Sequence, residues 1–410
     1  TTTNLQIVMT EMVVHTCREC QLSTRWFCCS QTTISNLFID MKYTFNPTKR
    51  ILMGPGPSDA HPRVLKAMSS PLMGHLDPEF IQMMDDVKRM VQEIFITKNH
   101  LTFVVSAPGS AGMETCLVNL LEPGDECIIC VNGVFGGRMV DIAERCGAKV
   151  YRIDIEWGMV TEPDQIKKAL SHCPKPKLVA LVHAETSTGA LQPLQEISDL
   201  VHDAGALLVV DAVTSFAGVP LKVDEWKIDA IYTGSQKCLS APPGLSPVSF
   251  SEAAVKVLEN RKSKVQSWFL DLSMVKNYWA GAKRAYHHTA PVSSVFALYE
   301  ALNLVLEEGL ENRWTRHKQI HEYLKLKLEK LGFRFLVEEK YRLPNLNSVF
   351  LPEGLDEAKL RNELLIKYNI EVGGGLGAFA GKIWRIGIMG ESCTENHVNM
   401  LVGALEEMTS

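Results

Sequence analysis

The chain is predicted to fold as an α/β protein with a mainly parallel sheet, followed by a smaller α+β region. Three features of its sequence predict this. Short apolar runs alternate with amphipathic segments from about residue 101 to residue 233, which is the pattern of βαβ units. Small and polar residues follow several of the apolar runs, at the strand ends where an open parallel sheet binds its ligands. Beyond residue 332 the order of strands and helices becomes α+β in character.

Apolar residues at helical spacing predict a first helix over residues 78–95. Strands of the main sheet are expected at 101–105, 126–131, 149–155, 178–183, 206–210 and 230–233, with helices at 111–121, 136–146, 165–171 and 194–203. Later helices are expected at 291–308, 313–331, 356–368 and 395–407, and later strands at 334–337, 347–351 and 383–388. We therefore expect a large domain over residues 61–310 and a smaller α+β domain over 311–410, which residues 41–60 join.

The size and charge of the chain exclude several classes of protein. It has 410 residues, of which 46% are hydrophobic and 22% charged, enough for a large core and two domains. The formal net charge is -5 and no basic face recurs along the chain, so no nucleic-acid partner is expected. No apolar run reaches the length of about 18 to 20 residues that spans a bilayer, so no membrane partner is expected either.

The 11 cysteines predict neither a disulfide framework nor a metal site. Cys17, Cys20, Cys28 and Cys29 lie in the first 40 residues, and the adjacent second pair lacks the spacing of zinc ligands. The others are expected to be buried free thiols, which predicts a reducing compartment, and we expect the cytoplasm. Residues 1–40 show no clear periodicity and are expected to be an appended, disordered leader. Two arginines against three acidic residues do not resemble an organelle transit peptide.

Lys237 and Asp211 carry the strongest functional signal. Lys237 follows an apolar run through small polar residues and precedes the turn Ala241-Pro-Pro-Gly244, which is a poor setting for a solvated charge. Desolvation favours the free amine that a Schiff-base nucleophile needs. Asp211 closes the preceding strand, and a carboxylate there suits a pyridinium nitrogen. A solvated loop lysine and a helix cap are the competing interpretations, but together the two residues indicate a pyridoxal-phosphate enzyme.

The turn Ser106-Ala-Pro-Gly109-Ser110 follows a strand and opens a helix. Free amides at a helix N-terminus bind anions, and glycine lets a phosphate approach them. Gly109 and Ser110 are therefore candidate phosphate ligands, although many strand–helix turns contain glycine and serine. Gln236, next to Lys237, is a further candidate phosphate donor, unless it is an ordinary loop amide.

Three further residues could complete such a site. Phe135 follows the strand 126–131, where its ring either stacks on a flat heteroaromatic ring or packs in the core. Thr186 offers a hydroxyl to a phenolic oxygen, or is simply a turn former. Arg385 lies in an otherwise apolar strand and needs a partner, which is either a substrate carboxylate bound bidentately or an internal ion pair.

From about residue 50 to the C-terminus, the order of several motifs resembles that of class V, fold-type I aminotransferases, specifically the alanine-glyoxylate and serine-pyruvate aminotransferases. The matching stretches are Gly54-Pro-Gly-Pro-Ser58, Leu117-Val-Asn-Leu-Leu-Glu-Pro-Gly-Asp125, Ser187-Thr-Gly-Ala-Leu-Gln-Pro-Leu194, Gly234-Ser-Gln-Lys237, Ala241-Pro-Pro-Gly244, Tyr286-His-His-Thr289 and Arg385-Ile-Gly387. The resemblance implies a large domain with a mainly parallel seven-stranded sheet flanked by helices. It also implies transamination with pyridoxal 5'-phosphate, between a small amino acid such as alanine or serine and a 2-oxo acid such as glyoxylate or pyruvate.

The resemblance assigns a role to each matching residue. It implies Lys237 as the Schiff-base lysine, Asp211 on the ring nitrogen and Thr186 near the ring hydroxyl. Phe135 stands at the stacking position, where animal members often have tryptophan. The phosphate ligands that the resemblance implies are Gly109, Ser110 and Gln236, with Tyr286 and Thr289 from the neighbouring subunit of an obligate homodimer.

The resemblance also bears on substrate binding. It implies Arg385 on the substrate carboxylate, with Gly54 and His75 as the next candidates. Ureidoglycine-glyoxylate aminotransferases are close relatives that carry glutamine at the position of His75 and asparagine at that of Tyr286, so the alanine-type activity is favoured. The alternatives are a ureidoglycine-glyoxylate or 3-hydroxykynurenine aminotransferase, a class V lyase or desulfurase using Cys393, and a cofactor-free binding protein of the same fold.

Overall fold

The computed structural model describes residues 45–280 and 284–409. The description below concerns the compact unit Lys49–Ser410. The predicted leader at residues 1–40, together with its four cysteines, lies outside the described residues.

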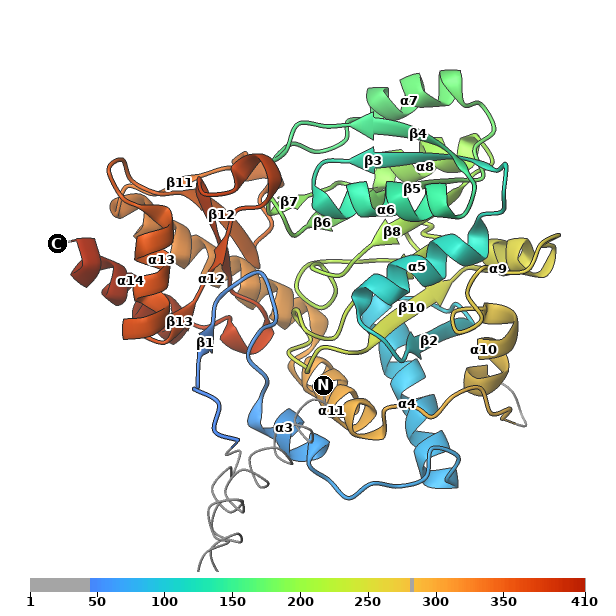
Figure 1. Cartoon of the computed structure of the whole chain (residues 1–410), viewed down its shortest axis with the longest axis horizontal. Coiled ribbons are helices and arrows are strands. Elements are labelled where there is room, and N and C mark those ends of the chain that lie inside the picture. Colours follow the sequence, from blue (N-terminus) through green and yellow to red (C-terminus); the bar gives the residue numbers. More distant parts are fainter. Residues whose placement is uncertain (1–44, 281–283, 410) are drawn as a thin grey trace, which may run out of the picture. The chain divides into compact units, whose positions relative to one another are not determined.

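A seven-stranded sheet forms the centre of this unit (Figure 1). Its strand order is β2-β10-β9-β8-β5-β3-β4. The bounds are β2 Leu101–Val105, β3 Glu126–Val131, β4 Lys149–Asp154, β5 Leu178–Val182, β8 Leu207–Asp211, β9 Ala230–Tyr232 and β10 Ser246–Phe250. β10 runs antiparallel to both of its neighbours, and the pairs from β9 to β4 are parallel. The sequence therefore predicts every strand of this sheet except β10.

Helices pack on this sheet or on one another. Their bounds are α3 Pro62–Met68, α4 Pro78–Phe95, α5 Gly109–Leu120, α6 Val134–Arg145, α7 Pro163–His172, α8 Gln195–Asp203, α9 Glu252–Glu259, α10 Leu272–Ala280 and α11 Val292–Glu308. α5 packs against α6 and lies on β9 and β10, while α7 packs against α8 (Figure 1). Every residue of β2, β5 and β8 is buried, as expected for strands covered on both faces.

The sequence does not predict β10 because its composition is unfavourable for an internal strand. Ser246-Pro-Val-Ser-Phe250 contains a proline and two serines. Pro247 lies near the start of the strand, where its carbonyl accepts a hydrogen bond from Thr233 N at 2.9 Å. The short helices α3, α9 and α10 are missed as well, since few turns give little periodic signal.

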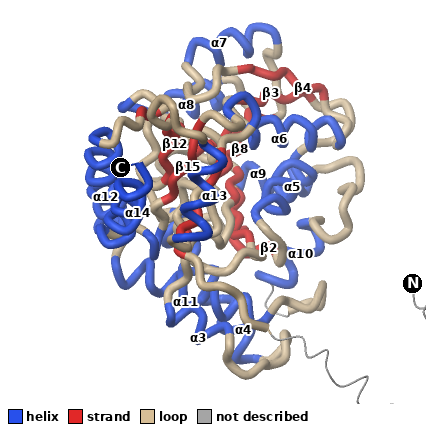
Figure 2. Tube along the Cα trace, turned by 60° about the vertical axis from the view of Figure 1, so that its left-hand side comes forward, coloured by secondary structure: helices blue, strands red, loops and turns tan. Residues whose placement is uncertain are grey.

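A four-stranded antiparallel sheet forms what we call the small lobe, with strand order β11-β12-β15-β14. Its strands are β11 Arg334–Phe335, β12 Leu346–Phe350, β14 Gly373–Gly374 and β15 Ile383–Gly387, and its helices are α12 Leu310–Lys330, α13 Glu357–Lys367 and α14 Glu395–Thr409. Figure 2 shows these helices around the sheet. An apolar core of its own, which includes Phe333 and Trp384, holds the small lobe together.

Short elements complete the unit. β1 (Ile51–Leu52) pairs in parallel with β13 (Ile370–Glu371), so the chain near residue 51 contacts the small lobe. β6 (Ala184–Glu185) and β7 (Ala190–Leu191) form a small hairpin. Turns of 3-10 helix span Glu339–Tyr341, Gly377–Phe379 and Gly390–Ser392. The predicted domain boundaries at residues 60 and 310 stay predictions.

The described residues also bear on the cysteines and on membrane insertion. The seven free cysteines there, Cys116, Cys127, Cys130, Cys146, Cys173, Cys238 and Cys393, are all buried, as predicted. None of the helices in this part of the chain is both long enough and apolar enough to cross a membrane.

Candidate active site

Three loops meet at the carboxyl end of the large sheet. They follow β2, β8 and β9. The first ends at Gly109, the first residue of α5, and the other two contain Val213 and Gly234. A Cβ atom added to Gly109 would lie 3.3 Å from Val213 Cγ2 and 3.6 Å from Gly234 Cα, so the loops touch and leave little room for a side chain. The residues predicted to follow the strands are thus brought together, as expected at this edge of a parallel sheet.

Lys237 is buried in the loop after β9, with 7% of its surface exposed. Its amine donates a hydrogen bond to the carbonyl of Pro55, and a Cβ added to Gly56 would lie 2.7 Å from the amine nitrogen. Burial and the guanidinium of Arg385 lower the pKa of Lys237 to about 8, although nearby acidic groups oppose this shift. The amine is therefore partly deprotonated near neutral pH, which is what a nucleophilic lysine needs.

Asp211 ends β8 and is 2% exposed. Its Oδ1 accepts the Val213 N–H, and its Oδ2 accepts the Tyr232 hydroxyl, each at 2.8 Å. Burial raises the pKa of Asp211 to about 6, against these hydrogen bonds and the charges of Lys237 and Arg138. Asp211 is thus a carboxylate at pH 7 in a setting closed to water. The sequence does not single out Tyr232, which reads as a core residue of its strand.

The N-terminus of α5 lies among hydroxyl and basic groups. Its N-cap residue makes no side-chain hydrogen bond to the helix. Arg138 Nη1 donates to Ser110 Oγ at 3.0 Å, and Ser106 Oγ is hydrogen-bonded to His288 Nε2 at 2.7 Å. Amides at a helix end, hydroxyls and a guanidinium together suit an anion such as a phosphate. The sequence indicates this anion site but not Arg138, which reads as a surface residue of α6.

The remaining predicted ligand groups lie on the neighbouring loops. Gln236 Oε1 is buried and has no hydrogen-bond partner among the described residues. Phe135, at the start of α6, is half-buried, with the guanidinium carbon of Arg138 5.1 Å from its ring centroid. Thr186 Oγ1 lies 2.5 Å from Thr214 Oγ1. A ligand at this place would meet an unsatisfied amide oxygen, an aromatic ring and a hydroxyl pair.

Glu185 is a second buried carboxyl that the sequence does not indicate. Its Oε1 accepts hydrogen bonds from the amide and hydroxyl of Ser187, at 2.9 and 2.5 Å. Burial raises the pKa of Glu185 to about 7. A Cβ added to Gly133 would lie 2.3 Å from the carboxyl carbon, so Glu185 packs against the N-terminus of α6. It supports the helix that carries Phe135.

Arg385 lies in the middle of β15 and is 8% exposed. Its Nε donates to the carbonyl of Gly374 at 2.8 Å, and its Nη1 to the carbonyl of Thr186 at 3.1 Å. Burial lowers the pKa of Arg385 to about 10, while Glu185 raises it. Both hydrogen-bond partners are neutral, and no ion pair joins Arg385 to a carboxylate within the described residues. This favours a ligand carboxylate over an internal ion pair.

Of the other predicted residues, Gly54 lies beside β15, the strand that contains Arg385. A Cβ added to Gly387 would lie 1.9 Å from the Gly54 carbonyl oxygen, which places Gly54 beside β15. His75 instead contacts Tyr286, with ring centroids 5.4 Å apart. Tyr286 is 62% exposed, and Thr289 is exposed as well. Tyr286 and Thr289 are therefore exposed, and His75 is half-buried beside Tyr286.

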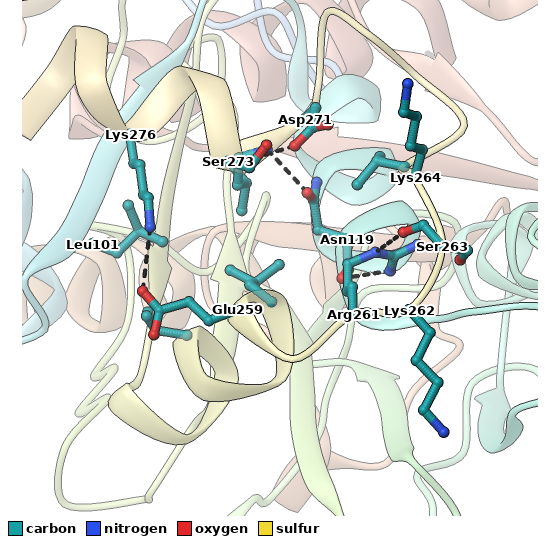
Figure 3. Close-up of a pocket in the computed structure, with 14 residues that line it drawn as sticks. Leu101, Asn119, Glu259, Arg261, Lys262, Ser263, Lys264, Asp271, Ser273 and Lys276 are labelled. Carbon is teal, nitrogen blue, oxygen red and sulfur yellow. Dashed lines mark hydrogen bonds and ion pairs between the residues drawn. The ribbon is translucent and has the colours of Figure 1, made fainter.

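A separate cavity of about 520 Å³ lies at the other end of β2 and α5 (Figure 3). Its lining includes Leu101, the first residue of β2, and Asn119, near the end of α5. Lys276 and Glu259, also in the lining, form an ion pair at 3.2 Å. None of the predicted site residues lines this cavity. Because ligands of parallel sheets bind beyond the carboxyl ends of the strands, it is not the candidate active site.

Comparison with known proteins agrees with this geometry. The family described as Aminotransferase class-V matches residues 52–389. An alanine–glyoxylate aminotransferase of Callithrix jacchus is 42% identical over 361 residues, which is 87% of each chain. An (S)-ureidoglycine–glyoxylate transaminase of Bacillus subtilis is 38% identical over 375 residues, covering 87% of this chain and 90% of that one.

A solved structure shows the same fold. The crystal structure of an alanine–glyoxylate aminotransferase from Nostoc sp. matches with a TM-score of 0.87 at 45% identity, covering 90% of this chain and 99% of that one. It confirms the predicted α/β fold with a mainly parallel sheet flanked by helices. The family match and the relatives together confirm the predicted enzyme class, and the chain belongs to the class-V aminotransferase family.

Proposed function

We propose that the protein is a pyridoxal-5'-phosphate-dependent aminotransferase that passes the amino group of alanine or serine to glyoxylate or pyruvate. One observation carries the proposal. Lys237 has a buried amine whose pKa is lowered to about 8. It shares a site with the buried carboxylate of Asp211 and the buried guanidinium of Arg385. The names of two relatives, which are alanine–glyoxylate aminotransferases, support this choice of substrates.

The phosphate end of the site fits this cofactor. Gly109 leaves space where a Cβ would crowd Val213, and Arg138 lies beside the Ser110 hydroxyl. Gln236 Oε1 is buried without a partner in the described part of the chain. Because an amide oxygen only accepts, Gln236 would donate to a phosphate oxygen through Nε2, and Oε1 would accept from a bound water. We propose that Gly109, Ser110 and Gln236 hold the phosphate, with Arg138 adding positive charge.

The ring end fits as well. Phe135 would stack on the pyridine ring, Asp211 would contact its nitrogen, Thr186 its hydroxyl oxygen, and the amine of Lys237 would hold it covalently. When bound, pyridoxal phosphate supplies an electron sink that stabilises negative charge at the α-carbon of the substrate. Asp211 strengthens this sink, because a carboxylate beside the ring nitrogen keeps that nitrogen protonated.

The protein's own residues then move one proton and orient the substrate. Once the amino group of the substrate has replaced Lys237 on the cofactor, Lys237 Nζ is a free amine. It would take the proton from the α-carbon and, as a general acid, donate it to the cofactor carbon that had held the lysine. Arg385 binds the α-carboxylate through two parallel hydrogen bonds, which fixes the α-carbon relative to Lys237. Amino acids and 2-oxo acids both carry this carboxylate, so one arginine serves both halves of the exchange.

The alternatives differ in how well the structure supports them. A desulfurase would need a reactive cysteine, but Cys393 is fully buried, and burial raises its pKa to about 12. Such a thiol is a poor nucleophile. The ureidoglycine–glyoxylate activity remains the second candidate, since a relative that is 38% identical carries that name.

We further propose a homodimer in which Tyr286 and Thr289 contact the phosphate bound by the partner subunit. Leu76, Trp268 and Tyr286 are exposed large apolar residues, and Trp268 stacks on His287 at 4.7 Å, next to Tyr286. Exposed apolar surface of this kind is typical of an interface. Cofactor affinity should then depend on protein concentration, and an active monomer that retains its cofactor would contradict this dimer.

A cytoplasmic location is also part of the proposal. The seven buried free cysteines fit a reducing compartment. Cell fractionation tests this location. Recovery of the protein in the fraction of an oxidising compartment would contradict it.

A substrate panel tests the activity. Alanine, serine, ureidoglycine, 3-hydroxykynurenine and cysteine would each be offered as donor, with glyoxylate or pyruvate as acceptor, and kcat/KM would be measured for each pair. We expect the highest values with alanine or serine. A clear preference for ureidoglycine would assign the protein to that activity, and sulfide release from cysteine would support a desulfurase. Failure of the purified protein to bind pyridoxal phosphate would reject the cofactor.

A further inference from the structure

Tyr232 and Asp211 are neighbours across two parallel strands. They are register partners in the β8–β9 pair, so their side chains leave the sheet on the same face. The Tyr232 hydroxyl donates to Asp211 Oδ2 at 2.8 Å. Tyr232 is 0% exposed, so no water competes for this hydrogen bond.

Helix α5 packs closely on the strand that carries Tyr232. A Cβ added to Gly112 of α5 would lie 3.0 Å from Tyr232 Cβ and 2.1 Å from Ser246 Oγ, so the helix backbone contacts the strands directly. Burial and the charge of Asp211 raise the pKa of Tyr232 well above its usual value. The hydroxyl therefore stays protonated and remains a donor throughout the range in which enzymes work.

We propose that Tyr232 is a positioning residue of the aminotransferase site, whose hydroxyl keeps Asp211 ionised and fixes the orientation of its carboxylate toward the cofactor's ring nitrogen. The inference rests on the function proposed above. It assigns a role to a residue that the sequence presents only as part of the core.

The reason lies in the setting of Asp211. A carboxylate removed from water is stable only if donors or positive charges replace its hydration. The Val213 N–H donates a hydrogen bond to Oδ1, and the Tyr232 hydroxyl donates one to Oδ2. The other titratable or charged groups that face Asp211 are Lys237, Arg138, Glu185 and Cys116.

These charged groups do not stabilise the ionised form of Asp211 in every state of the enzyme. Lys237 loses its charge whenever its amine acts as nucleophile or base, and its support for Asp211 is then lost. Arg138 is exposed, so solvent and salt screen its charge. Glu185 is an acid and can only disfavour the ionised form of Asp211. The neutral donors Tyr232 and Val213 act in every state of the enzyme, and of these only Tyr232 can be replaced without altering the backbone.

Carboxyl titration of the cofactor-free protein tests the first part of the proposal. Aspartate side chains would be labelled with 13C, and the Asp211 signal assigned by its loss in Asp211→Asn. We expect Tyr232→Phe to raise the pKa of Asp211 by roughly one to two units, so that the carboxyl is largely protonated at pH 7. Tyr341→Phe, which removes a hydroxyl that donates to Glu162 at the surface, is the matched control and should leave the Asp211 pKa unchanged.

A second variant changes the hydrogen bond in the opposite direction. Fluorotyrosine placed at residue 232 keeps the shape of the ring and makes the hydroxyl a better donor, so it should lower the pKa of Asp211. In the loaded protein, 15N NMR of labelled pyridoxal phosphate should show a protonated ring nitrogen in the wild type. In Tyr232→Phe we expect the same proton to be lost at a lower pH.

The outcomes separate this proposal from the function on which it rests. If the pKa of Asp211 does not move in either variant while the protein still binds pyridoxal phosphate, Tyr232 has no positioning role. If the pKa moves as expected but the wild type binds no pyridoxal phosphate, the proposed function fails and the Tyr232–Asp211 coupling stands. If turnover falls in Tyr232→Phe without any change in carboxyl or ring-nitrogen titration, the residue is only structural and the proposal is overturned.

Discussion

The two sheets present their functional side chains in different ways. In the large sheet, Asp211 is the last residue of β8, and Lys237 lies in the loop after β9. In the small lobe, Arg385 is the central residue of β15, which pairs with β12 on one side and β14 on the other. A strand end allows the chain to bend as the chemistry requires, whereas a residue within a ladder is fixed on both sides. The proposed reactive groups thus lie where the backbone is adjustable, and the proposed recognition group where it is rigid.

The two buried cations also differ in charge. The pKa of Lys237 is lowered to about 8, and that of Arg385 to about 10. Near neutral pH the lysine is therefore close to losing its proton, while the arginine keeps its charge. The group at the strand end acts by becoming neutral, and the group within the strand acts by remaining charged.

The largest effect is expected at the strand end. Lys237→Ala removes both the covalent attachment and the proton carrier, so kcat should fall by at least about 1,000-fold. After borohydride treatment of the loaded protein, mass spectrometry should find the cofactor on the Lys237 peptide in the wild type and on no peptide in the variant. Lys222→Ala, which removes an exposed lysine paired with Glu225, is the control. A reducible attachment that survives in Lys237→Ala would contradict the assignment.

A smaller effect is expected within the rigid strand. Arg385→Lys keeps the charge but loses the planar fork, so kcat/KM for carboxylate substrates should fall by roughly 100-fold while the cofactor stays bound. Most of the loss should appear in KM. Arg334→Lys, at an exposed position in the same sheet, should change neither constant. If KM is unchanged in Arg385→Lys, carboxylate recognition would lie elsewhere, with Gly54 and His75 the next candidates.

The two regions should also influence each other. After burial, the charge of Arg385 is the second cause that lowers the pKa of Lys237. A lysine amine reacts as the free base, so acylation of Lys237 in the cofactor-free protein should rise with pH through a midpoint near 8. In Arg385→Gln this midpoint should move to higher pH, because the opposing charge is gone, while in Arg385→Lys it should move little. Mass spectrometry at a series of pH values measures it, and equal midpoints in all three proteins would show that burial alone sets the shift.

The smallest effect is expected outside the family match, which begins at residue 52. Deletion of residues 1–40 should change the melting temperature by no more than about 2 °C and leave kcat unchanged. Differential scanning calorimetry and a standard assay measure both. A marked loss would assign a structural role to this segment, and the same loss on adding a chelator would restore the zinc interpretation.

The sequence predicts the groups that follow apolar strands but not those inside them. Lys237, Asp211 and Arg385 can be recognised because a polar residue interrupts or ends an apolar run. Tyr232 gives no such signal, since a tyrosine is typical of a strand. Its importance depends on the register between β8 and β9, which places it opposite Asp211.

The same limit explains the other residues that the sequence does not indicate. In the sequence, Arg138 resembles an ordinary exposed helix residue. Only the packing of α6 beside α5 brings it to Ser110. Glu185 reads as part of a turn, and its contact with Gly133 depends on how two distant loops meet. β10 is missed because Pro247 is unfavourable in a strand, although the strand supplies the direct return path for the loop of Lys237.

That return path has a consequence for engineering. Because β10 runs antiparallel to β9, the loop of residues 233–245 starts and finishes at the same edge of the sheet. It is closed by hydrogen bonds of its own, from Ser235 N to Leu245 O at 3.0 Å and from Ser235 Oγ to Pro242 O at 2.7 Å. A parallel neighbour would instead have required a crossover of a dozen or more residues, usually a helix. The lysine is thus carried on a loop that joins two adjacent strands without a crossover. A grafted loop could place a different nucleophile there if its backbone still offered the carbonyls of residues 237 and 238 to Ser58 and Arg313.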